Sequence, residues 1–359
     1  MPSRLPFIDA LKALAAQLIV LHHLAFYGPM SDHAHALAPD LISWFSQDAR
    51  YAVQVFLVLG GFLAVQSLAP AGHLRVTEPL GVLWKRCCKL AGPYLVALLV
   101  ALLGAAIGRA LMVHDSLPGP PTLSQVLAHV FLLQSILGHE GLSAGVWYIA
   151  IDLQLFALLL GLLWLARQVA AGTAREAAVA AGLVATLALA SLCHFNLDAE
   201  WDSWGVYFFG SYALGVASYW ATSGPPQRAT RWLVAVVTVV VLTLLFEYRP
   251  RIAVALVVAL ALALARHLGI VERWPKPRLV AYLGRTSYSL FLVHFPVCLL
   301  VNALFSRFAQ HDPWLNLVGL FVAWLASMAA AALFYRFVEA AMQGPRRPHA
   351  ALAAVRRSS

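Results

Sequence analysis

Ionisable side chains interrupt the first long apolar stretch of the chain, residues 7–27. Asp9, Lys12, His22 and His23 lie in this stretch, although an ionisable group inside lipid costs at least about 2.5 kcal/mol and therefore usually faces a polar interior. Lys12 and His23 are eleven residues apart, so at about 100° and 1.5 Å per residue they return to nearly one helix face, roughly 16 Å apart. His22, one residue earlier, is expected to point elsewhere. A helix here would present a cation and an imidazole to one shared cavity.

Two polar residues of later apolar stretches are expected at the same depth as His23. Asp152 lies in GVWYIAIDLQLF and His294 in SYSLFLVHFPV, and both fall about 6–9 Å below the same membrane surface at the helical rise. His23 could remove a proton from an acceptor hydroxyl, while Asp152 could orient the imidazole or stabilise its charged form. Each could instead have a structural role, such as a hydrogen bond to a backbone carbonyl.

Basic residues gather near the opposite surface and could hold a phosphate-bearing ligand. These residues are Lys12, Arg86, Lys89 and Arg285. Arg86 and Lys89 could instead be anchors that only orient the chain in the membrane. The sequence contains no glycine-rich phosphate loop, zinc-type cluster or Gly-x-Ser-x-Gly elbow, so no metal site is predicted.

Other polar and aromatic residues are secondary candidates for the site. The polar ones are Asp9, Ser287, Tyr288 and His294. Ser287 and Tyr288 could equally pack helices or hydrogen-bond across them. Trp147 and Tyr148, at the start of a span, are typical of aromatic residues at a membrane surface.

The composition indicates which elements position these residues. Of 359 residues, 61% are hydrophobic and 11% are charged, which is more apolar surface than one soluble core could hide. We therefore predict an all-α, polytopic membrane helix bundle. Its ten predicted spans are 7–27, 50–69, 90–112, 146–166, 177–195, 203–221, 232–248, 252–268, 280–305 and 313–338.

The distribution of basic residues predicts the orientation of the bundle. With the N-terminus in the cytoplasm, five of the 25 lysines and arginines lie on the outer side: Arg50, Arg109, Arg249, Arg251 and Arg307. The positive-inside rule therefore places both termini in the cytoplasm. The net charge of +9 follows from this topology and not from nucleic-acid binding.

Two segments do not belong to the predicted spans. Residues 122–138 are apolar, but an eleventh span there would reverse every later loop and remove the charge asymmetry. We predict a short re-entrant or interfacial helix on the outer side. The chain would then form one transmembrane domain, residues 1–340, and a basic cytoplasmic tail, residues 341–359.

Five segments, in this order, resemble the motifs of integral-membrane acyltransferase family 3, the O-acetylase type. They are PFIDALKALAAQLIVLHH with Lys12 and His23, YAVQVFLVLGGFL, WKRCCKLAGPY with Arg86 and Lys89, GVWYIAIDLQLF with Asp152, and LGRTSYSLFLVHFPV with Arg285, Ser287, Tyr288 and His294. RFVE adds Glu339 at the family's terminal acidic position. The chain departs from the pattern at four positions: Lys12 and Lys89 replace arginine, Asp152 replaces glutamate, and Gly60 stands where serine is usual.

The resemblance implies transfer of an acyl group, commonly acetyl from acetyl-CoA, to a sugar hydroxyl. It also implies that His23 is the catalytic base and that Arg86 and Lys89 help to hold the donor. We therefore expect an O-acyltransferase of a bacterial inner membrane. Its partners would be acyl-CoA as co-substrate, a glycan or glycosylated acceptor and membrane lipid, with no permanently bound cofactor. A transporter or flippase for a glycan or lipid-linked intermediate would use the same buried residues and is the alternative.

Overall fold

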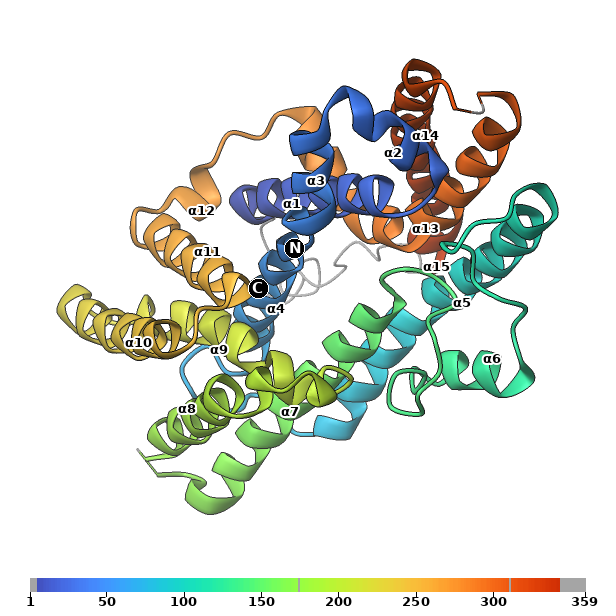
Figure 1. Ribbon diagram of the computed structural model, residues 1–359. Helices are drawn as coiled ribbons and strands as arrows, with labels where there is room; N and C mark the ends of the chain where they lie inside the picture. The colour runs from blue at the N-terminus through green and yellow to red at the C-terminus, as the bar shows by residue number, and fades with distance from the viewer. Residues whose placement is uncertain (1–4, 174, 310, 343–359) are drawn as a thin grey trace, which may run out of the picture.

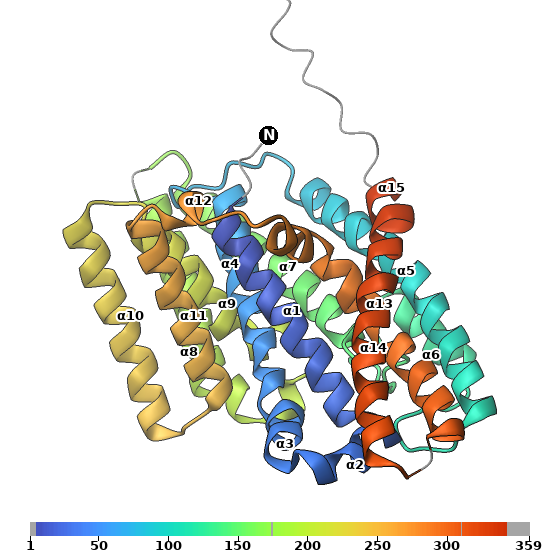
Figure 2. The same ribbon diagram turned by 90° about the horizontal axis from the view of Figure 1, so that it is seen from above.

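The protein is an all-helical bundle in the part of the chain that the computed structural model describes, residues 5–173, 175–309 and 311–342. No strand occurs among these residues, so the predicted fold class is confirmed. The longer helices are α1 (Pro6–Phe26), α4 (Val53–Leu68), α5 (Pro79–Leu111), α7 (Val146–Ala170), α8 (Glu176–Cys193), α9 (Gly205–Ala221), α10 (Pro226–Phe246), α11 (Pro250–His267), α13 (Arg278–Phe308) and α14 (Pro313–Phe334). The shorter ones are α2 (Pro29–Ala34), α3 (Pro39–Gln47), α6 (Leu123–Val130), α12 (Ile270–Arg273) and α15 (Ala340–Met342). Figures 1 and 2 show the long helices packed side by side, with the short ones toward the periphery.

Nine helical segments of the described chain are long and apolar enough to cross a membrane, against ten predicted spans. The remaining prediction, 203–221, corresponds to α9, which has only 17 residues and is buried along most of its length. In Figure 2, α9 returns the chain from the end of the bundle where α8 stops to the end where α10 begins. The start of α1 and the end of α14 consequently lie at the same end of the bundle, as ten passes require (Figure 2).

Proline positions explain where several of these helices begin. Helices α1, α5, α11 and α14 each start at a proline, whose missing N–H removes a donor that has no partner in the first helical turn. The start of α5 lies well before the predicted span 90–112, so Arg86 and Lys89 lie on this helix and not in a loop before it.

The centre of the bundle is held by glycines at the crossing of α4 and α9. A Cβ on Gly61 would lie 1.9 Å from the carbonyl oxygen of Tyr212, and a Cβ on Gly215 would lie 1.9 Å from that of Val58. Only glycine lets two helix backbones touch in this way, which is the usual basis of close packing between membrane helices. The contact fixes the position of Tyr212, which faces the candidate site.

The segment 122–138 forms the short helix α6 and not an eleventh span. Its eight residues are too few to cross a bilayer. A capping box between Thr122 and Gln125 starts the helix, and the hydroxyl of Tyr94 in α5 donates to the carbonyl oxygen of His129 at 3.0 Å. Figure 1 shows α6 at the edge of the molecule beside α5.

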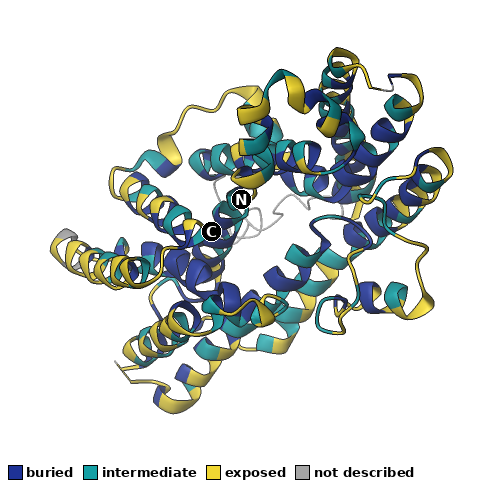
Figure 3. Ribbon diagram, in the orientation of Figure 1, coloured by how far each residue is buried: buried dark blue, intermediate teal, exposed yellow. Residues whose placement is uncertain are grey.

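Exposed apolar side chains cover the outside of the bundle. Figure 3 shows that helix faces turned toward neighbouring helices are buried, whereas α10 at one edge is largely exposed. Trp232, Leu242, Leu245 and Phe246 of α10 are exposed although they are large and apolar. Such a surface is stable against lipid, so the protein is an integral membrane protein.

Candidate active site

A pair of histidines lies at the contact between α1 and α13. Nδ1 of His23 lies 2.6 Å from Nε2 of His294, and the two rings stack with centroids 4.9 Å apart and planes 5° apart. His294 is fully buried, and His23 is 8% exposed. The structure therefore brings together two of the predicted site residues, although 271 residues separate them in the sequence.

The hydrogen bonds of His294 determine which nitrogen of His23 is free. Nδ1 of His294 lies 2.9 Å from the carbonyl oxygen of Leu290, and because a carbonyl only accepts, this nitrogen carries the hydrogen of the neutral ring. Nε2 of His294 then has a lone pair and accepts from Nδ1–H of His23. The Nε2 atom of His23 is left with its own lone pair, as a general base requires.

His23 lines a cleft of about 540 Å³ at the end of the bundle where α1 ends. Loops contribute most of the other lining residues, from 115–119 after α5 and from 134–145 after α6. His22 also lines this cleft, with its ring centroid 5.0 Å from that of His23. The expectation that His22 points elsewhere is wrong, because both residues are close to the end of α1 and the cleft is wide enough to reach two adjacent side chains.

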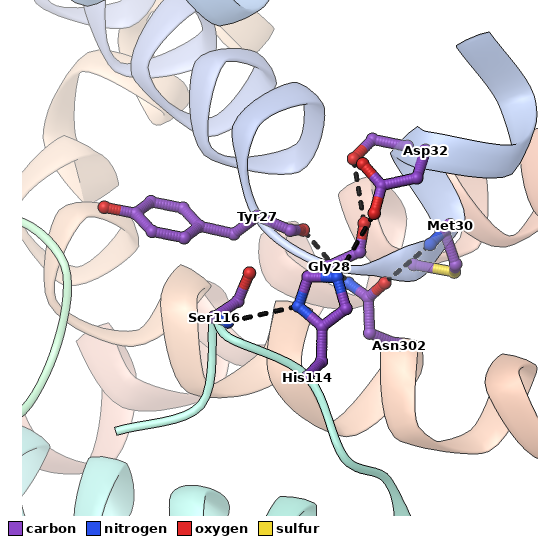
Figure 4. A network of polar contacts seen from close by, with 8 residues as sticks. Tyr27, Gly28, Met30, Asp32, His114, Ser116 and Asn302 are labelled. Atoms are coloured by element: carbon purple, nitrogen blue, oxygen red, sulfur yellow. Dashed lines mark hydrogen bonds and ion pairs between the residues drawn. The ribbon is translucent and has the colours of Figure 1, made fainter. Parts of the chain in front are cut away.

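The end of α1 is held in place by Asn302 of α13 (Figure 4). The Oδ1 atom of Asn302 accepts from the N–H of Met30 at 3.1 Å, and its Nδ2 donates to the carbonyl oxygens of Cys298 at 3.0 Å and Tyr27 at 3.5 Å. Gly28 has a φ of +102°, and a Cβ there would lie 2.3 Å from Oδ1 of Asn302. The chain thus turns sharply five residues after His23.

The loop after α5 is attached to α2 through His114, also in Figure 4. Nδ1 of His114 accepts from the N–H of Ser116 at 3.1 Å, so Nε2 carries the hydrogen and donates to Asp32 at 3.2 Å. Arg109 holds the same loop by donating to the carbonyl oxygen of Pro118 at 2.8 Å. One wall of the cleft is therefore fixed by hydrogen bonds at both of its ends.

A second polar cluster surrounds Asp152 of α7. One guanidinium nitrogen of Arg86, on α5, lies 2.7 and 3.0 Å from the two oxygens of Asp152, and the guanidinium lies 4.4 Å from the centre of the Phe156 ring. Lys12 interacts electrostatically with Asp9, Lys89, Asp152 and Arg86. Three cations and two carboxylates leave this cluster with one net positive charge.

The arrangement corrects two expectations about these residues. Asp152 does not hydrogen-bond His23; its carboxylate contacts Arg86, and the partner of His23 is His294. Lys12 is not among the residues that line the cleft around His23, contrary to the expectation that both face it. The helical spacing predicted a common face for Lys12 and His23, but a face 16 Å long can border two separate sites.

Aromatic rings lie between the cleft and the cluster around Asp152. The ring of Phe291, which lines the cleft, lies 5.4 Å from the ring of Tyr148 and 6.3 Å from that of His294. Tyr148 interacts electrostatically with Asp152 and Arg86 on its other side. Tyr148 therefore lies inside the bundle. Trp147 stacks on Phe208 at 5.5 Å and borders the cleft.

Tyr212 of α9 is a candidate site residue that the sequence does not indicate. Its hydroxyl and the Nε atom of Arg86 are buried without a hydrogen-bond partner among the described residues, and both groups interact electrostatically with Asp152. A buried donor without a partner costs about 1–3 kcal/mol, so two such donors in one cluster indicate a place where a ligand accepts hydrogen bonds. Tyr212 lies in the aromatic run GVYFFGSYALGVASYW, where no spacing distinguishes it.

The remaining predicted residues have structural contacts or are exposed. Ser287 donates to the carbonyl oxygen of Gly284 at 3.0 Å, and Tyr288 donates to that of Leu90 at 2.9 Å. Arg285 and Lys89 are exposed, and Asp9 is half-buried. For Ser287 and Tyr288, the alternative of helix packing is the one that the contacts favour.

Comparison with known proteins adds one finding to this geometry. A family model described as an acyltransferase domain matches residues 5–336. Searches of curated proteins and of solved structures gave no match.

Proposed function

Because that match covers most of the chain, the protein belongs to acyltransferase family 3 and is a membrane acyltransferase, and we propose that it acylates a hydroxyl of a glycan or glycosylated acceptor. The donor is an acyl-CoA, with acetyl as the transferred group, and the membrane is a bacterial inner membrane. No permanently bound cofactor takes part. The transporter alternative has no support from the family.

The observation that carries the proposal is the free Nε2 atom of His23 at the wall of the cleft. An acceptor hydroxyl in the cleft gives its proton to this atom, while its oxygen attacks the thioester carbonyl. The carbon–sulfur bond then breaks, and the imidazolium returns the proton to the CoA thiolate. In transfer through the imidazole itself, Nε2 attacks the thioester and CoA leaves as the thiolate; the acceptor hydroxyl then attacks the acyl-imidazole, Nε2 is regenerated, and the hydroxyl proton passes to the CoA thiolate.

His294 is a positioning residue for this reaction. It touches neither substrate in the proposed arrangement, but its Nε2 accepts from Nδ1–H of His23 and keeps the reactive nitrogen unprotonated. Its own Nδ1 is held by the carbonyl oxygen of Leu290. This chain of hydrogen bonds corresponds to the role of the orienting group in catalytic triads.

The donor approaches from the cytoplasmic side, where the predicted topology places Lys12, Arg86 and Lys89, and it reaches the cluster around Asp152. Lys12 and the exposed Lys89 attract the phosphates of CoA, because the cluster has a net positive charge. The unpartnered donors of Tyr212 and Arg86 then bind a carbonyl oxygen of the acyl or pantetheine group. The acyl end passes between Tyr148 and Phe291 to reach His23.

Acetyl transfer by the purified protein in lipid nanodiscs tests this proposal. Radiolabelled acetyl-CoA and a neutral glycoside should give labelled ester with the wild-type protein, and His23→Ala should lower the rate by at least about 10²-fold, the usual contribution of a general base. His267→Ala is the matched control, because His267 is an exposed histidine near the end of α11. Near-normal transfer by His23→Ala would exclude the mechanism.

A further inference from the structure

His22 is a second histidine that lines the cleft. Its Nδ1 lies 3.2 Å from the carbonyl oxygen of Phe45, and a carbonyl only accepts, so Nδ1 of the neutral ring is the donor. Nε2 of His22 therefore has a lone pair. His22 is 9% exposed and lines the same cleft as His23.

The two neighbouring histidines have equivalent hydrogen-bonding states. In each ring Nδ1 is occupied, by Phe45 for His22 and by His294 for His23, and Nε2 accepts. The ring centroids are 5.0 Å apart and the planes are tilted by 46°. Two hydroxyl groups on adjacent carbons of a sugar ring are spaced closely enough to donate one hydrogen bond to each ring.

The rest of the cleft is also rich in hydrogen-bond acceptors. Gln134 is 1% exposed, lines the cleft, and has no hydrogen-bond partner for Oε1 among the described residues. Asp115 and Glu140 line the cleft as well, and among the described residues Arg50 is the one arginine or lysine that lines it. This set of groups fits a ligand whose polar groups are donors, and it disfavours an anionic sugar.

We propose that the cleft binds a neutral sugar through a vicinal diol. The hydroxyl to be acylated donates to Nε2 of His23, the hydroxyl on the adjacent carbon donates to Nε2 of His22, and a further hydroxyl reaches Oε1 of Gln134. The first hydroxyl gives up its proton during transfer, and the second keeps its proton. This inference rests on the proposed function and names the part of the acceptor that the enzyme recognises.

Deoxy sugars test the inference directly. Methyl β-D-glucopyranoside and its 2-, 3-, 4- and 6-deoxy analogues are compared as acceptors of radiolabelled acetyl from acetyl-CoA, with the site of acylation on the parent determined by NMR. Removing the hydroxyl next to the acylated one should lower kcat/KM for the wild-type protein about tenfold, the effect of one lost hydrogen bond. Equal kcat/KM for that analogue and the parent would overturn the inference.

Variants of His22 make the test specific to this residue. His22→Phe should lower kcat/KM for the parent sugar about tenfold, mainly through KM, and should show no further loss with the analogue that lacks the adjacent hydroxyl. His22→Gln keeps a donor for Phe45 and an acceptor for the sugar, so it should restore most of the activity. His267→Phe should behave as the wild type. If the His22→Phe change and the missing hydroxyl each lowered kcat/KM independently, the result would contradict a hydrogen bond between His22 and this hydroxyl.

Failure of this inference can be separated from failure of the proposed function. Cleavage of acetyl-CoA that depends on His23, without acylation of any neutral glycoside, would overturn the inference about the acceptor and agree with the reaction. Loss of both acetyl-CoA cleavage and glycoside acylation would overturn the inference and the proposed function together.

Discussion

Nε2 of His294 accepts a hydrogen bond from Nδ1 of His23 at 2.6 Å, and this contact joins α1 to α13. Replacing His294 by Phe removes the acceptor and lets Nε2 of His23 carry the hydrogen instead. We expect kcat to fall at least about 10- to 100-fold, the effect of losing a group that orients a metal-bound histidine, with little change in the KM for either substrate. His294→Gln retains an acceptor in a similar position and should recover part of kcat. A wild-type kcat for His294→Phe would contradict the positioning role.

The ion pair between Arg86 and Asp152 has separate effects on stability and on donor binding. Asp152→Asn leaves the guanidinium without its counter-charge, and because the Arg86 side chain is 30% exposed, the free energy of unfolding should fall by roughly 1–3 kcal/mol, less than for a fully buried pair. Combining this change with Arg86→Gln removes both charges and should restore stability, measured by thermal unfolding in detergent. Activity should stay low in the double variant. Wild-type activity of the double variant would exclude a role of Arg86 and Asp152 in catalysis.

Tyr212→Phe should weaken donor binding without weakening the fold. The hydroxyl of Tyr212 is buried without a hydrogen-bond partner in the part of the chain that the structure describes, so its removal should leave the unfolding free energy unchanged or raise it by about 1 kcal/mol. The KM for acetyl-CoA should rise about tenfold, since one hydrogen bond to the donor is lost. Tyr94→Phe is the matched control: its hydroxyl donates to His129, so this variant should lose about 1 kcal/mol of stability at an unchanged KM for acetyl-CoA. An unchanged KM in Tyr212→Phe would show that the hydroxyl does not meet the donor.

The hydrogen bonds and burial of His129 allow us to predict how the free energy of unfolding depends on pH. Its Nδ1 donates to the carbonyl oxygen of Gln125 at 2.7 Å, and its Nε2 accepts from the N–H of Leu142 at 3.0 Å, so the fully buried ring is satisfied only when neutral. Burial lowers the pKa of His129 below its ordinary value of 6.5. The unfolded chain then binds a proton near pH 6.5 while the folded protein does not, so the free energy of unfolding falls as pH drops below this value.

Thermal unfolding between pH 7.5 and pH 5.5 checks this dependence. His129→Gln offers a donor and an acceptor that do not titrate, and its unfolding temperature should vary less over this range. The segment around Leu142 lines the cleft, so acceptor binding should weaken with the same dependence on pH in the wild-type protein. An equal slope in the two proteins would assign the dependence to other groups.

Substitution of two glycines by alanine separates the effect of close helix packing on stability from the effect of helix propensity. Gly61→Ala places a Cβ 1.9 Å from the carbonyl oxygen of Tyr212, which forces α4 and α9 apart, and the variant should unfold at a much lower temperature or fail to accumulate. Gly161→Ala in α7 meets no atom within 4 Å and should be neutral or stabilising by up to about 1 kcal/mol. Equal stability of the two variants, measured by thermal unfolding, would exclude the proposed role of the α4–α9 contact.

The fold was largely predictable because long apolar runs leave few alternatives inside lipid. The predicted spans 280–305 and 313–338 lie within α13 and the segment from α14 to α15, and the segment 122–138 contains only the short α6. The shortness of α9 was not predictable, since its burial among other helices lets 17 residues complete a pass. The cytoplasmic orientation and the boundary at residue 340 stay predictions, and most of the basic tail, residues 343–359, lies outside the described part of the chain.

Most residues of the candidate site could be predicted from the sequence, whereas the contacts between them could not. His23 and His294 were placed at one depth by helical rise alone, and they meet. Asp152 was placed at that depth as well, but which partner a carboxylate takes depends on how each helix is rotated about its axis, and the sequence of one helix does not determine this. Tyr212 and the position of His22 depend on the contact between α4 and α9 and on the width of the cleft, which emerge only when all helices are assembled.

The two imidazoles that meet in the bundle are synthesised far apart in time. His23 leaves the ribosome near the start of translation, and its partner follows 271 residues later. A chain whose synthesis stops before α13 has neither the acceptor for Nδ1–H nor the asparagine that holds the end of the first span. Under the proposed mechanism we therefore expect nascent and truncated chains in the membrane to lack an activated base and to consume no acyl donor until the protein is almost complete.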